Sequence, residues 1–171
     1  ISEKARVELE KALRIHPLYM EAHLQMGNIY VYQKDYEGAI ERYQYILNHM
    51  PDDEDAFANL QIALRERGRQ IAMNSGNIPL AKEYLNRSLG MKPDDTEALM
   101  LVGMAEGSLG NTEAAIRLFE RAIQIKPDHA QAYFNMGITF QRAGQLQKAE
   151  AMFAQAQKLD PRIFEKNQTG K

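Results

Sequence analysis

The sequence predicts an all-α protein built as a solenoid of stacked antiparallel helix pairs. Residues 96–129 are followed directly by a second copy of the same pattern at 130–163, and a fixed period of this length is typical of a stacked repeat. Apolar residues within each copy recur at the helical period of 3.6 rather than at the strand period of 2. These pairs match between the copies: Gly103 with Gly137, Gly110 with Gly144, Ala115 with Ala149, Phe119 with Phe153, Ala122 with Ala156 and Pro127 with Pro161.

Prolines extend this pattern over the whole chain. One follows the second helix of each unit, at equal intervals except for a longer one between Pro51 and Pro93, and proline stops a helix. The chain opens on Ile1 inside a repeat, so we interpret it as a piece of a longer protein. The predicted organisation is one array over 1–171: a half-repeat at 1–19, repeat 1 at 20–53, repeat 2 at 54–95, repeat 3 at 96–129, repeat 4 at 130–163 and a tail at 164–171.

The second repeat departs from the pattern. It holds eight extra residues between Leu64 and Gly76, and Gln61 stands where the other repeats have a small glycine. Either the first helix runs on past Gly68, or the insert forms a longer loop between the two helices. A helix lengthened by eight residues reaches about 12 Å further, and the return to Pro79 is then short. We favour part helix and part loop.

Composition excludes several classes of function. The 171 residues carry a formal net charge of −2 and contain no cysteine. This charge gives no general attraction to nucleic acid. Without cysteine there are no disulfides, thiolate metal sites or cysteine nucleophiles, and the chain fits the cytoplasm, which we favour, as well as a bacterial periplasm. No apolar run reaches the ~18 residues of a membrane span, so no membrane insertion is expected in this segment.

The repeat slots resemble those of the tetratricopeptide repeat (TPR) family over essentially the whole chain. In the family an aromatic is followed by Leu-Gly, an aromatic, Ala, an aromatic, Ala and Pro. Small residues at fixed slots let two helices approach to about 8–10 Å. The first full repeat presents His23, Met26-Gly27, Tyr30, Ala39, Tyr43 and Pro51, and the last presents Tyr133, Met136-Gly137, Phe140, Ala149, Phe153, Ala156 and Pro161. The resemblance implies a right-handed superhelical solenoid.

The resemblance also implies a concave groove lined by the first helix of each pair. Asn59 and Asn135 fall in the slot where relatives that bind extended peptides present asparagine, whose amide can both donate to and accept from a peptide bond. Methionine and other apolar residues beside them predict adaptable pockets. The basic slots that grip a terminal carboxylate in some relatives hold Leu24, Glu97 and Leu101 instead. The expected groove residues are Gln25, Asn28, Asn59, Ile62, Met100, Met104, Phe134, Asn135 and Ile138.

Few other residues suggest chemistry. Arg65, Arg67 and Arg69 form a basic cluster that could bind an acidic partner, although arginines on a helix surface are usually solvated. The histidines lack the paired spacing of a metal site, and no catalytic Ser/His/Asp order or phosphate-binding glycine loop is present. We therefore expect no enzyme activity, no cofactor and no metal.

The sequence predicts a protein-interaction module. The main hypothesis is that the groove binds an extended peptide or a helix of another protein, apolar to neutral in character. A second hypothesis is a structural scaffold that associates weakly with itself through exposed terminal helices. A third is a targeting arm of a larger protein, such as a membrane-anchored bacterial one.

Overall fold

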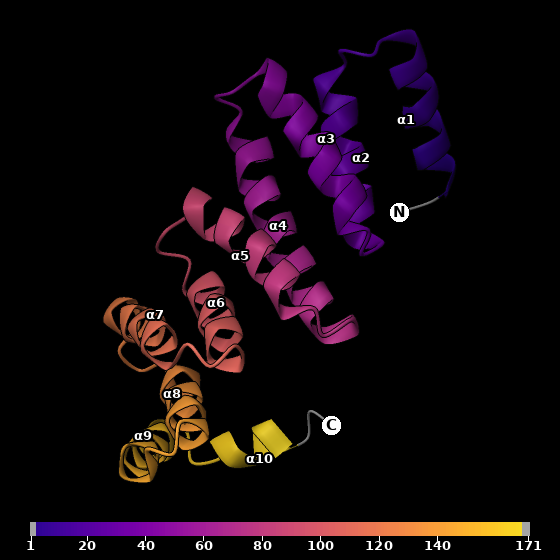
Figure 1. Ribbon diagram of the computed structural model, residues 1–171. Helices are drawn as coiled ribbons and strands as arrows, with labels where there is room; N and C mark the ends of the chain where they lie inside the picture. The colour runs from indigo at the N-terminus through magenta and orange to yellow at the C-terminus, as the bar shows by residue number, and fades with distance from the viewer. Residues whose placement is uncertain (1–2, 169–171) are drawn as a thin grey trace.

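The computed structural model describes residues 3–168 and is entirely helical over this range (Figure 1). Ten helices follow one another in these residues, and there are no strands among them. Their bounds are α1 (Glu3–Ile15), α2 (Met20–Tyr32), α3 (Tyr36–His49), α4 (Glu54–Asn74), α5 (Ile78–Met91), α6 (Thr96–Ser108), α7 (Thr112–Ile125), α8 (Ala130–Arg142), α9 (Leu146–Leu159) and α10 (Ile163–Gln168).

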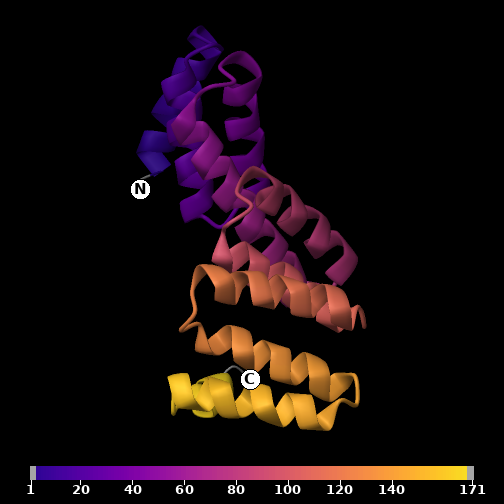
Figure 2. The same ribbon diagram turned by 90° about the vertical axis from the view of Figure 1, so that its left-hand side faces the viewer.

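The helices stack in chain order as antiparallel pairs, α2 with α3, α4 with α5, α6 with α7 and α8 with α9, and each pair packs on the next. The all-α solenoid expected from the sequence is therefore confirmed. The array changes direction along its length. In Figure 2 helices α1–α3 run steeply, whereas helices α6–α9 run across the view, and α4 and α5 join the two halves.

Within three of the pairs a glycine lets an aromatic ring lie against the helix backbone. A Cβ atom added at Gly27 would lie 2.4 Å from the ring of Tyr43, and one added at Gly103 would lie 2.5 Å from the ring of Phe119. Gly137 is related in the same way to Phe153. These contacts hold the two helices of a pair at short range, and the rings of Tyr43 and Phe119 are fully buried.

The second pair corrects the expectation of a partial loop. Helix α4 is one uninterrupted helix of 21 residues, where α2, α6 and α8 have 13 each. The inserted stretch contains mostly residues of good helix propensity, so the helix continues to Asn74. The link from Ser75 to Asn77 is as short as the links in the other pairs, because α5 begins where the lengthened α4 ends.

The register of the second pair also differs from the one inferred from the sequence. Gly68, not Gln61, provides the close contact, since a Cβ at Gly68 would lie 2.6 Å from Leu85 Cγ and 2.9 Å from the backbone oxygen of Ala81. Counted from the first residue of its helix, Gly68 lies seven positions further along α4 than Gly27 lies along α2. Seven positions are close to two turns, so the insert lengthens α4 ahead of the contact without rotating its faces.

Candidate functional site

A groove of about 720 Å³ lies between α4, α6 and α8, with the start of α5 at one side. Its lining is mostly apolar and includes Met100, Leu101 and Met104 of α6, Met73 of α4 and Ile78 of α5. The side chains of Met73 and Met104 are 77% and 49% exposed. Exposed methionines present a flexible, polarisable surface that adapts to different apolar partners.

Asn135 of α8 is a polar group in this apolar lining. It is 7% exposed, and its Oδ1 accepts a hydrogen bond from Gln131 Nε2 at 3.1 Å. Its Nδ2 is buried and has no hydrogen-bond partner within the part of the chain that the structure describes. Gln131 is itself held in place by Asn167 of α10, whose Oδ1 accepts from Gln131 Nε2 at 3.0 Å. Asn135 therefore lines the groove with an amide whose buried NH₂ group is unpaired within the described residues.

Met100, Met104 and Asn135 are the expected groove residues that line this groove. Asn28 and Asn59 lie together elsewhere, at the contact of α2 and α4, where Asn59 Nδ2 donates to Asn28 Oδ1 at 3.4 Å. Asn28 Oδ1 also accepts from the Tyr43 hydroxyl at 2.8 Å. These two amides are thus engaged with each other and with the core.

Gln25 and Ile62 are exposed on α2 and α4 and do not line the groove. The Gln25 amide donates to Glu21 of the same helix. Because the contact glycine of α4 is Gly68, the residue that follows it, Arg69, takes the place on α4 that Met104 takes on α6. Arg69 lines the groove, whereas Ile62 lies about two turns and Asn59 almost three turns before that position.

Phe134 and Ile138 face away from the groove expected for them. Phe134 is 7% exposed and packs with Phe153 and Phe164, at ring-centroid distances of 5.5 and 5.3 Å. Ile138 packs against the same cluster. The short helix α10 brings Phe164 onto α8 and α9, and this contact places Phe134 in the core. Helix α10 begins at Ile163, so the segment expected as a tail from residue 164 starts inside a short helix.

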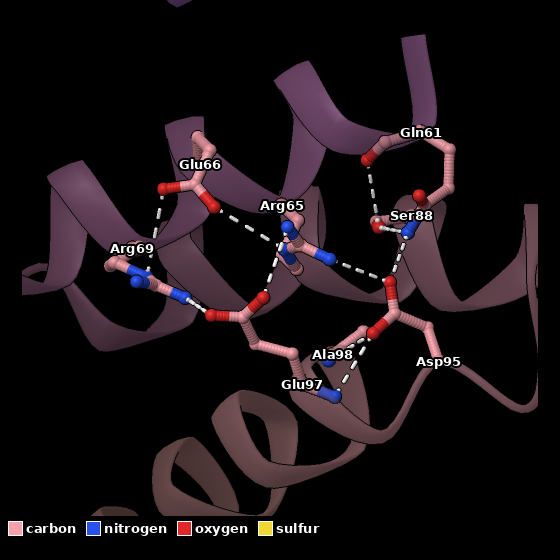
Figure 3. Close-up of polar contacts among 8 residues, drawn as sticks. All are labelled: Gln61, Arg65, Glu66, Arg69, Ser88, Asp95, Glu97 and Ala98. Carbon is pink, nitrogen blue, oxygen red and sulfur yellow. Dashed lines mark hydrogen bonds and ion pairs between the residues drawn. The ribbon is translucent and has the colours of Figure 1, made fainter. Parts of the chain in front are cut away.

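The three arginines of the basic cluster pair with carboxylates of the chain itself, and Figure 3 shows these contacts for Arg65 and Arg69. Arg65 Nη1 donates to Asp95 Oδ2 at 2.8 Å, and its Nη2 lies 3.0 Å from Glu97 Oε2. Arg69 also pairs with Glu97, and Arg67 Nε donates to Glu37 Oε2 at 3.0 Å. Because these charges are compensated within the chain, the three arginines do not present an unpaired basic patch to an acidic partner.

The same contacts form a polar joint between the second and third pairs (Figure 3). Gln61 is buried and its Nε2 donates to Ser88 Oγ at 2.8 Å and to Asp95 Oδ2 at 2.6 Å. Asp95 Oδ1 caps α6 by accepting from the backbone amides of Glu97 and Ala98. Burial acts to raise the pKa of Asp95, but hydrogen bonds from Ala98 and Gln61 and the charge of Arg65 outweigh it and hold the pKa below its ordinary value.

Among the groove residues that were not found from the sequence, Lys126 and His129 lie in the connection between α7 and α8. Burial lowers the pKa of His129, the positive charge of Lys126 lowers it further, and the charge of Asp128 acts in the opposite direction. Only helix slots were counted in the sequence, so a residue of the connection gave no signal.

Two further properties concern residues 3–168. No group of three or more His, Asp or Glu side chains in this range is placed to hold a metal ion. None of its helices combines the length and the apolar character needed to cross a lipid bilayer.

Comparison with protein families identifies the chain. Two tetratricopeptide repeat family models match it, one over residues 94–162 and the other over residues 22–57. The chain is a tetratricopeptide repeat protein. Neither match includes residues 58–93, where the TPR pattern is interrupted by the lengthened α4. TPR units are protein-interaction repeats, and the chain is accordingly a protein-interaction module. No curated protein sequence matches it.

Solved structures include similar TPR solenoids. YrrB, described as "a TPR protein with an unusual peptide-binding site", is 26% identical with a TM-score of 0.66 over 91% of this chain and 76% of its own. MamA is 22% identical with a TM-score of 0.65 over 92% of this chain and 87% of its own, which shows the fold alone. A Thermobaculum terrenum O-GlcNAc transferase mutant is 29% identical with a TM-score of 0.58, over 63% of this chain but 20% of the transferase.

Proposed function

We propose that this TPR protein is a non-catalytic module that binds a segment of a partner protein in the groove between α4, α6 and α8. The observation that carries the proposal is Asn135, a residue that lines an apolar groove and whose buried Nδ2 lacks a partner among the described residues. Leaving a buried donor unpaired costs about 1–3 kcal/mol. A rotation of the Asn135 side chain would turn this donor toward a ligand in the groove, and a ligand that accepts the hydrogen bond recovers that free energy when it binds.

The carbonyl of a peptide bond is the acceptor that fits. It is present at every residue of a partner segment, so one donor can hold the backbone of an extended peptide or of an exposed helix end. Met73, Met100 and Met104 then supply apolar surface for the partner's side chains. The likeness to YrrB, a TPR protein described as having a peptide-binding site, supports a peptide ligand.

A phage-displayed library of random dodecapeptides tests the proposal. Clones selected on the wild-type protein are expected to lose at least about tenfold in affinity on Asn135→Ala. Asn59→Ala is the matched control, because Asn59 is also an asparagine on the first helix of a pair but does not line the groove. Circular dichroism confirms that both variants fold. Equal binding to wild type and Asn135→Ala, or loss on Asn59→Ala instead, would contradict the proposal.

A further inference from the structure

Not every charged side chain that lines the groove has a partner of opposite charge. Four line it: Arg69, Glu97, Lys126 and His129. Arg69 and Glu97 neutralise each other as an ion pair. Within residues 3–168 the ammonium of Lys126 belongs to no ion pair. An otherwise apolar groove therefore carries one uncompensated positive charge, next to the start of α8.

His129 can add a second positive charge at the same place when its ring is protonated. It precedes the first residue of α8, and its backbone N–H donates to the Lys126 oxygen at 3.2 Å. Its ring is half-buried, and the groups that act on it are Lys126 and Asp128 of the same connection, with the Arg69–Glu97 pair in the same groove. Burial and Lys126 lower its pKa, so the ring is neutral at pH 7. An anion bound beside it would stabilise the protonated form.

We propose that the partner segment carries an Asp or Glu side chain beside its apolar residues, and that this carboxylate binds at Lys126 and His129. This inference rests on the proposed function and specifies its ligand. The apolar lining fits apolar side chains of the partner segment, the Asn135 amide fits a backbone carbonyl, and the Lys126 ammonium fits an anion on the same segment. The anion belongs to a side chain, because a chain terminus is commonly held by several charged donors and here a single ammonium is unpaired. A phosphate-rich polymer would find one free cation in an apolar groove, too little for the several contacts that such binding needs.

Binding should then be linked to protonation of His129. A carboxylate beside the ring raises the pKa of His129 in the complex above its value in the free protein, so the complex takes up a proton. Affinity for an acidic peptide therefore increases as the pH falls from 7.5 to 5.5, a range in which a peptide Glu stays ionised. The neutral analogue of the same peptide has no such dependence.

The test uses the peptide library described above, displayed with the peptide's C-terminus fused to the coat protein so that the peptides have no free C-terminal carboxylate. Asp and Glu are expected to be enriched near apolar residues in clones selected on the wild type. One selected sequence is then synthesised with an amidated C-terminus, as a Glu form and as a Gln form, and a third form keeps Gln but has a free C-terminus. Affinities are measured by fluorescence anisotropy on the wild type, Lys126→Gln, His129→Gln and Lys92→Gln.

Lys92→Gln is the matched control, because Lys92 precedes Pro93 as Lys126 precedes Pro127 one repeat later, and Lys92 does not line the groove. The Glu form should bind about two- to fivefold more weakly to Lys126→Gln, as for an ion pair in contact with water, and equally well to Lys92→Gln. The Gln form should not distinguish them. His129→Gln should remove the gain in affinity at pH 5.5.

The outcomes separate this inference from the function on which it rests. Clones that need Asn135 but show no enrichment of Asp or Glu, or a Glu form that binds Lys126→Gln as well as wild type, overturn the acidic site and leave peptide binding standing. Tighter binding of the form with a free C-terminus than of the Glu form assigns the charge to a chain terminus and also overturns it. A library that yields no binder overturns both proposals.

Discussion

Substitution of Gly68 by alanine tests the register of α4, because the register decides whether the free energy of unfolding rises or falls. Alanine has a helix propensity about 1 kcal/mol better than glycine, so Gly68→Ala would stabilise the protein if Gly68 had no close neighbour. The structure instead places a new Cβ 2.6 Å from Leu85 Cγ and 2.9 Å from the Ala81 backbone oxygen. The backbone oxygen cannot move aside as a flexible side chain can. Overpacking of a close helix contact costs about 1–3 kcal/mol, so after subtracting the gain in helix propensity we expect a net loss of up to about 2 kcal/mol.

The matched control is Gly90→Ala, in the last turn of α5, where a Cβ would have no atom within 4 Å. This variant should gain up to about 1 kcal/mol from helix propensity. Urea unfolding followed by far-ultraviolet circular dichroism measures both variants against the wild type. A Gly68→Ala protein as stable as Gly90→Ala would show that Gly68 is not the contact glycine and would refute the assigned register.

Three further predictions follow from individual contacts. Gly137→Leu should destabilise by about 3 kcal/mol through overpacking, since a Cβ there would lie 2.5 Å from Phe153; an unchanged melting temperature would contradict the slot assignment. Asp95→Asn should cost about 2 kcal/mol at pH 7. The folded pKa of Asp95 lies below its ordinary 3.8, so this cost is complete above that pH and disappears as the pH falls through the folded value; acid titration of both proteins checks this, and a constant difference would refute it. Asn135→Leu should stabilise by about 1 kcal/mol while weakening peptide binding, because it removes a buried unpaired donor at the position that Leu101 occupies one repeat earlier; lower stability would indicate that the donor is paired.

The helix pairs could be predicted because their cause is local and repeated. A small residue in one helix and a large apolar one in the next recur at fixed distance, as at Gly103 and Phe119. The register of α4 was missed because positions were counted from the start of the repeat, which assigned the slot to Gln61. A signal was present, since the interval from Gly68 to Leu85 is only one position longer than that from Gly27 to Tyr43. Counting back from the second helix would have located it.

The candidate site was predicted less completely, because it depends on how successive pairs are placed. Of the residues expected in a groove, Met100, Met104 and Asn135 line the groove between α4, α6 and α8. Phe134 lies in a core cluster because α10 supplies Phe164, a contact between segments that no helical period reveals. The groove also takes Arg69 from the lengthened α4, and Lys126 and His129 from a connection. A regular repeat count includes neither the extra length of α4 ahead of Gly68 nor the residues of a connection.

Helix α4 has seven more residues before its contact glycine, Gly68, than α2 has before Gly27. This extra length has a geometric consequence. Because the seven residues make almost two whole turns, every side chain after them points in the direction it would have without them, and only its height along the helix axis changes. An insertion of three or five residues would have rotated the apolar face of α4 away from α5. In a stacked array, length can therefore vary in steps of seven with little effect on the core. Each such step shifts the helix pairs that follow along the helix axis, and this shift can turn an open concave surface into a groove enclosed by side chains.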